Sequence, residues 1–117
     1  MVERELTVVA HYGWRDWLIQ RVTAVVMLLY MLFFLAVLIA LPQLDYERWR
    51  ALWSLAIMRY ATLLFVIAAL MHAWVGVRNI FMDYVKDTGL RLVLYVLTIV
   101  TLVIYAVWAW QVLWAVY

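Results

Sequence analysis

Residues 60–77, YATLLFVIAALMHAWVGV, form an uncharged run of about 18 residues between Arg59 and Arg78. A helix of that length is at the short end of what crosses the hydrocarbon core of a bilayer. The run also contains His72, and an ionisable side chain inside a membrane segment is costly to bury and usually functional. The stretch therefore predicts a transmembrane helix that carries a functional group.

Two further uncharged runs predict two more membrane spans. Residues 22–44 form a run of about 23 residues, and residues 92–117 contain no charge. Over 117 residues the chain is 72% apolar and only 14% charged, which is too hydrophobic for a soluble globular protein. We therefore predict an all-α integral membrane protein: a single domain, residues 1–117, with three transmembrane helices at about 16–41, 60–83 and 90–116.

Polar segments set the expected ends of these helices. Residues 1–15 are interpreted as an aqueous arm in which His11 is a solvated surface residue, and Asp16 is expected to cap the first helix. Pro42 should stop that helix. Residues 43–59 mix charges with tryptophans, which predicts a short helix at the water interface, and Gly89 is a natural terminator of the second span.

Charge and cysteine content exclude several functions and orient the chain. There is no cysteine, so c-type haem attachment, iron–sulfur ligation and thiol catalysis by this chain are excluded, and a net charge of +2 is too small to suggest nucleic-acid binding. The N-terminal region and the loop at 78–91 hold twice as many basic residues as the opposite side. The positive-inside rule then places the N-terminus and the loop at 78–91 in the cytoplasm, and the C-terminus on the opposite side of the membrane. The basic residues are Arg4, Arg15, Arg21, Arg78, Lys86 and Arg91 on the first side, and Arg48, Arg50 and Arg59 on the second.

His72 has three interpretations from the residues alone: a packed neutral side chain, a proton relay or a metal ligand. Ala68 and Gly76 lie four residues to either side, on the same helix face. Small residues there would leave room for a flat macrocycle, although they also allow close helix packing. An electron-transfer haem generally takes two axial ligands, and no other histidine lies within a span. If His72 binds haem iron, a second polypeptide is therefore expected to donate the other ligand.

Three other residues are candidates for a functional role, and for two of them a purely structural role is the alternative. Arg21, at the entrance of the first span, either reaches the lipid headgroups or pairs with an anion such as a haem propionate. Asp83 lies eleven residues beyond His72, so a continuous helix would return it to nearly the same face. Tyr84 is either an interfacial anchor or a hydrogen-bond donor to a quinone.

In combination, these motifs resemble the small cytochrome b membrane-anchor subunit of bacterial succinate:ubiquinone oxidoreductase, respiratory complex II. The matching elements occur in the family's order and cover most of the chain from the first span onward. The His-Ala-Trp-x-Gly element followed by Asp-Tyr is the most specific part. The elements are Asp-Trp-Leu-Ile-Gln-Arg-Val-Thr-Ala at 16–24, His-Ala-Trp-Val-Gly at 72–76, Asp-Tyr-Val-Lys at 83–86 and Arg-Leu at 91–92.

The resemblance implies half of a heterodimeric helical bundle around one haem b. It also implies a bacterial inner membrane, with the N-terminus in the cytoplasm and the C-terminus in the periplasm. His72 would be the axial ligand from this chain, and a second, larger cytochrome b anchor subunit would supply the other histidine. Tyr84 would bind ubiquinone, Asp83 would order that site, and Arg21 would lie near the haem propionates. An iron–sulfur subunit and a flavoprotein subunit complete the complex and carry out succinate oxidation, so this chain is expected to hold no catalytic residue of its own.

Two alternatives remain. The chain could be the anchor of a related quinol:fumarate reductase, with or without haem. A small proton-coupled transporter is less favoured, because such proteins usually need a carboxylate within a span and the three uncharged runs contain none.

Overall fold

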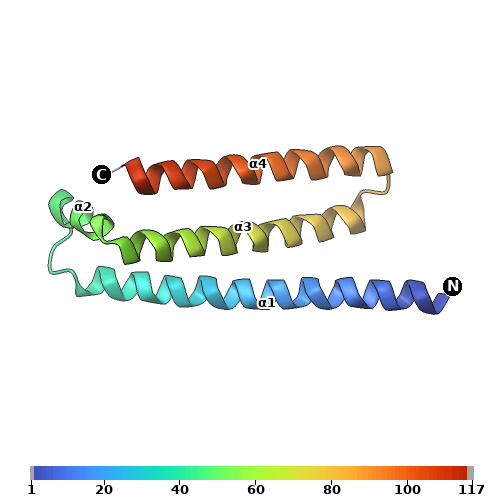
Figure 1. Ribbon diagram of the computed structural model, residues 1–117, viewed down its shortest axis with the longest axis horizontal. Coiled ribbons are helices and arrows are strands. Elements are labelled where there is room, and N and C mark those ends of the chain that lie inside the picture. Colours follow the sequence, from blue (N-terminus) through green and yellow to red (C-terminus); the bar gives the residue numbers. More distant parts are fainter. Residues whose placement is uncertain (1, 116–117) are drawn as a thin grey trace.

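The computed structural model describes the backbone of residues 2–115 and the side chains of residues 13–115. This part of the chain is almost entirely helical and contains no strand. Three of its helices are long and apolar enough to cross a membrane, which confirms the predicted fold class. The helices are α1 (Val2–Ala40), α2 (Tyr46–Ser54), α3 (Ala56–Tyr84) and α4 (Thr88–Ala115), shown in Figure 1.

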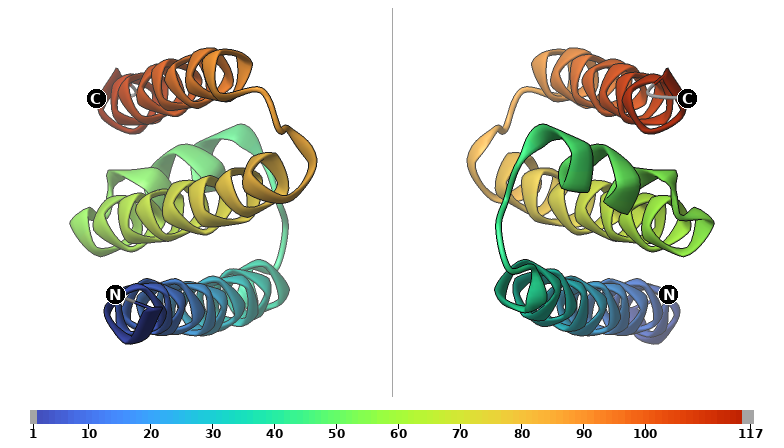
Figure 2. Two further views of the ribbon diagram at one scale, coloured as in Figure 1. Left: turned by 90° about the vertical axis from the view of Figure 1, so that its right-hand side faces the viewer. Right: turned by 90° about the vertical axis from the view of Figure 1, so that its left-hand side faces the viewer.

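The three long helices form an open layer rather than a closed bundle. α3 lies in the middle and packs against α1 on one side and α4 on the other, while short α2 packs on the first part of α3 (Figure 2). A single layer leaves both of its faces uncovered by this chain. Few side chains are therefore buried among the described residues, and the apolar ones are Leu52, Met58, Ala68, Val75 and Leu113.

The first helix begins much earlier than expected. The chain is helical from Val2, and Gly13 lies inside the helix. The aqueous location of residues 1–15 stays a prediction. A glycine in a helix interior reduces helix stability by about 1 kcal/mol relative to alanine. The helix propensity of the residues on both sides of Gly13 compensates for this loss. Asp16 therefore caps nothing, and its carboxylate pairs with Arg78 instead. The side chain of His11 lies outside the described residues.

The short helix predicted after Pro42 is present. α1 ends at Ala40, just before the proline. Asp45 then caps α2, because its side chain accepts a hydrogen bond from the backbone N–H of Arg48 at 2.8 Å. Leu55 separates α2 from α3, which begins at Ala56, somewhat before the expected start.

Gly89 does not terminate the second span, so that prediction was wrong. α3 ends at Tyr84, and Gly89 belongs to the first turn of α4. Its backbone N–H donates to the Asp87 carboxylate at 3.1 Å, and the Asp87 carbonyl accepts the N–H of Arg91 at 2.9 Å. Asp87 is thus the N-cap of α4, and a sharp turn between two helices is made without any residue of positive φ in the described chain.

Candidate functional site

The seam between α1 and α3 carries three polar side-chain contacts. Asp16 pairs with Arg78, Thr23 contacts His72, and Tyr30 contacts Thr62 at 2.6 Å between the two hydroxyl oxygens. The three α1 residues are seven positions apart, the repeat that keeps one helix face on its partner in left-handed packing. The seam therefore fixes which residues of α3 lie beside which residues of α1.

His72 lies in the middle of this seam. Its Nδ1 is 3.0 Å from the Thr23 hydroxyl oxygen, and Thr23 is only 5% exposed. No hydrogen bond from a described residue reaches the other ring nitrogen, Nε2. A side chain of α1 thus holds Nδ1, and Nε2 can bind a ligand from outside this chain.

A cavity of about 860 Å³ opens beside His72. Its volume falls within the roughly 300–1,000 Å³ typical of ligand sites. The structure brings His72 and Arg21, both predicted site residues, to this one cavity, between α1, α3 and the start of α4. The lining residues are Gly13, Asp16, Trp17, Gln20, Arg21, Ala24, His72, Arg78, Asn79, Met82 and Tyr95.

The cavity contains two arginines in different surroundings. Arg78 forms an ion pair with Asp16, whereas the Arg21 guanidinium lies 5.6 Å from the centre of the Trp17 ring and has no carboxylate partner in the described part of the chain. Arg78 and Asp16 were not predicted as site residues, because Arg78 only marked the end of a span. Among the described side chains, Arg21 is therefore the positive charge of the cavity that has no carboxylate partner.

Of the two roles expected for the small residues around His72, close helix packing is the one that contacts within this chain support. Ala68 is buried and lines an apolar groove beside Thr23, and neither Ala68 nor Gly76 lines the His72 cavity. A Cβ added to Gly76 would meet only the Gln20 Nε2 atom at 3.7 Å, an ordinary contact. The small residues that do line the cavity, Gly13 and Ala24, come from α1.

Asp83 and Tyr84 do not reach this cavity. α3 continues to Tyr84, as the spacing argument required, so both residues lie near the end of α3 beyond His72. Asp83 is exposed and Tyr84 is 80% exposed. Within the described chain, no second element covers them, so this chain contributes one surface to any site that they form.

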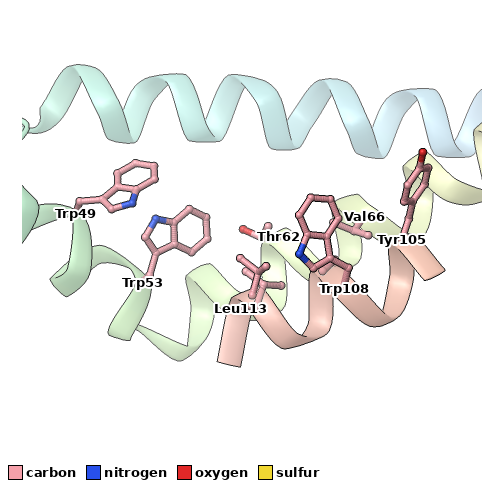
Figure 3. A pocket seen from close by; sticks show the side chains of 9 residues that line it. Trp49, Trp53, Thr62, Val66, Tyr105, Trp108 and Leu113 are labelled. Atoms are coloured by element: carbon pink, nitrogen blue, oxygen red, sulfur yellow. The ribbon is translucent and has the colours of Figure 1, made fainter. Parts of the chain in front are cut away.

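A second cavity, of about 460 Å³, lies near the other end of α3. Figure 3 shows the indole rings of Trp49 and Trp53 at one end of it and Tyr105 and Trp108 at the other. Its lining is almost wholly apolar and contains no acidic, basic or histidine side chain, so it offers no strong metal ligand and no fixed charge. None of the predicted site residues belongs to it.

The described residues contain no group of three or more His, Cys, Asp or Glu side chains that could hold a bare metal ion. A metal that brought its own equatorial ligands would need only one residue from this chain. The fold and cavity thus define a multi-pass α-helical membrane protein that presents one intramembrane histidine beside an arginine.

Comparison with known proteins agrees with this class. The family of succinate dehydrogenase/fumarate reductase transmembrane subunits matches residues 1–108. A relative from Coxiella burnetii, named succinate dehydrogenase hydrophobic membrane anchor subunit, is 42% identical over 102 residues, covering 87% of this chain and 89% of the relative. The chain belongs to the succinate dehydrogenase/fumarate reductase transmembrane subunit family. The prediction of a succinate dehydrogenase membrane anchor is confirmed, and other subunits of that oxidoreductase complex are its partners.

Proposed function

We propose that this anchor holds one haem b together with a second anchor subunit, and that His72 is the axial ligand from this chain. The observation that carries the proposal is the placement of His72, with Nε2 free of hydrogen bonds from the described residues, on a cavity that also contains Arg21. The haem would supply one-electron redox chemistry. The two-ligand requirement and the open helix layer both call for a partner helix with the second histidine.

The residues present fit a haem in both chemistry and charge. The porphyrin supplies the four equatorial nitrogens, so the lack of a protein metal cluster among the described residues is no obstacle. Its propionates are anionic, and a guanidinium binds carboxylates with charge-assisted hydrogen bonds. Arg21 would take this role, because Arg78 already faces the Asp16 carboxylate.

The exposed end of α3 supports the second half of the proposal, a part of the ubiquinone-reduction site. Tyr84 presents its hydroxyl at the level where α3 leaves the apolar span, and that hydroxyl can donate a hydrogen bond to a quinone carbonyl. Asp83 next to it would order the site and admit protons from the cytoplasm. Electrons would arrive from succinate oxidation in a flavoprotein subunit through an iron–sulfur subunit, so this chain acts as a non-catalytic anchor.

The haem assignment predicts the effect of replacing His72. In the purified complex, His72→Ala should weaken or shift the b-type band of the reduced-minus-oxidised visible spectrum, because one axial ligand is lost. The matched control is His11→Ala, which removes the only other histidine and should leave the spectrum unchanged. A parental spectrum from His72→Ala would refute the assignment.

The quinone assignment predicts a separate effect at Tyr84. Tyr84→Phe removes one hydroxyl, and a hydrogen bond worth about 0.5–1.5 kcal/mol corresponds to a rise of about 2–12-fold in the KM for ubiquinone. The haem spectrum should not change. Tyr46→Phe, which alters an exposed tyrosine on α2, is the matched control. Equal KM values for the Tyr84→Phe and Tyr46→Phe complexes would contradict this role.

The preferred direction of catalysis is a separate question, because the family also covers transmembrane subunits of fumarate reductases. Succinate:ubiquinone and quinol:fumarate reductase activities, measured on one preparation, distinguish a succinate dehydrogenase from a fumarate reductase. A complex that reduces fumarate faster than it oxidises succinate, or that contains no haem, would favour the fumarate reductase anchor.

A further inference from the structure

We infer that Thr23 is a positioning residue for His72, fixing the imidazole in the tautomer that leaves Nε2 unprotonated and able to bind iron. The inference rests on the proposed haem ligation. It means that a residue of α1 orients the proposed haem ligand on α3. The juxtaposition that carries it is the Thr23–His72 contact inside the helix seam.

The position of the hydroxyl proton follows from the three atoms around the Thr23 oxygen. That oxygen lies 2.6 Å from the Ile19 carbonyl oxygen, 3.3 Å from the Gln20 carbonyl oxygen and 3.0 Å from His72 Nδ1. A hydroxyl has one proton and two acceptor lone pairs. Two oxygens at 2.6 Å require a proton between them, so the hydroxyl donates to Ile19, one turn back along α1.

The donor in the cross-helix bond is therefore the histidine. With its own proton used on Ile19, the Thr23 oxygen can only accept, and His72 Nδ1–H donates to it. In a neutral imidazole one nitrogen is a donor and the other an acceptor, so the lone pair lies on Nε2. Because Thr23 is 5% exposed, water has little access to compete for this bond.

This bond has consequences for a bound metal. Histidine ligands usually donate their second N–H to a neighbouring group, which fixes the ring orientation and raises its basicity, and loss of that partner typically weakens metal binding about 10–100-fold. A more basic imidazole favours ferric over ferrous iron. Loss of the Thr23 acceptor should therefore lower haem occupancy and raise the haem midpoint potential.

Two pairs of variants isolate the hydroxyl in the intact complex. Thr23→Val keeps the shape of the parent side chain and removes only the hydroxyl, while Thr23→Ser and Thr23→Ala differ from each other by the same group. Thr101 supplies the control, since it makes the same bond one turn back, to the Leu97 carbonyl at 2.8 Å, on the exposed surface of α4. Thr101→Val should behave as the parent.

Haem content per complex and the midpoint potential from a spectroscopic redox titration are the readouts. We expect Thr23→Val to retain less haem than the parent and to have a higher haem midpoint potential. Thr23→Ala should differ from Thr23→Ser in the same two ways. For a one-electron couple, a tenfold change in ferric-over-ferrous preference corresponds to about 59 mV. Thr23→Ser should lie near the parent in both measurements.

Equal haem content and potential within either pair would overturn the inference. So would failure of both hydroxyl-free variants to assemble while His72→Ala assembles, because the hydroxyl would then serve helix packing alone. His72→Ala also distinguishes failure of the proposed haem ligation from failure of the Thr23 inference. If it keeps the parental spectrum, the haem ligation itself is wrong; if it loses the spectrum while the Thr23 variants do not, only the Thr23 inference fails.

Discussion

At the scale of single residues, the His72 cavity differs from an ordinary packing defect in its charge. Two guanidinium groups line it, and Asp16 compensates only one of them. An arginine near the end of a membrane span either extends to the lipid headgroups or pairs with an anion. This asymmetry assigns different tasks to two residues of the same type: Arg78 joins α3 to α1, and Arg21 remains available to a ligand.

The two arginines should therefore respond differently to neutralisation. Arg21→Gln is expected to speed haem transfer from the complex to a soluble apoprotein acceptor by about tenfold or more, since hydrogen bonds to charged groups contribute about 1.5–3 kcal/mol. Arg78→Gln should have a smaller effect on transfer, because Arg78 already shares its charge with Asp16. Equal rates of haem transfer from the two variants would show that Arg21 binds the propionates no more strongly than Arg78 does.

At the scale of helices, the turn between α3 and α4 depends on one cap. Asp87→Ala should destabilise the first turn of α4 by about 1 kcal/mol, the usual cost of losing an N-cap, and the amide of Gly89 should exchange with solvent about fivefold faster. Asp87→Asn removes the same charge but keeps a capping oxygen, so it is the matched control. Hydrogen exchange measured by mass spectrometry over residues 88–91 checks both variants. Equal acceleration in both would mean that charge, not capping, stabilises this turn.

The spans could be predicted from sequence because lipid imposes a simple length requirement on charge-free runs. Helix ends could not, since the bilayer boundary does not decide where a helix stops. α1 continues into the polar segment back to Val2, and α3 starts before the uncharged run, at Ala56. Gly89 was assigned to the wrong side of the turn because the capping aspartate two residues earlier was not recognised.

Residues of the candidate site could be predicted only where a single residue carried the signal. His72 stood out as an ionisable group in an apolar run, and Arg21 as the charge at a span entrance. The Asp16–Arg78 and Thr23–His72 contacts join different helices, and their register depends on how α1 packs on α3. The seven-residue spacing of Asp16, Thr23 and Tyr30 was the one clue in the sequence, and it has meaning only once the partner helix is known.

At the scale of the whole molecule, the open layer explains why one chain shows only part of each proposed site. α1 and α4 flank α3 without closing around it (Figure 2), and residues of all three helices line the His72 cavity, which stays open. At one end of the same layer, Tyr84 stands almost fully exposed. Both features are expected of a surface that partner subunits of the oxidoreductase cover.

The proposed orientation of this layer gives the last prediction. The chain contains no cysteine, so each introduced thiol reports a single position. Lys86→Cys lies in the turn between α3 and α4, and Glu47→Cys lies on exposed α2 near the opposite end of the layer. If basic residues keep the first side in the cytoplasm, a membrane-impermeant maleimide added to intact spheroplasts should label Glu47→Cys and spare Lys86→Cys, and inverted vesicles should reverse the pattern. Labelling of Lys86→Cys from outside would instead place Asp83 and Tyr84, the proposed quinone-site residues, in the periplasm. The proposed electron path from cytoplasmic subunits would then be untenable.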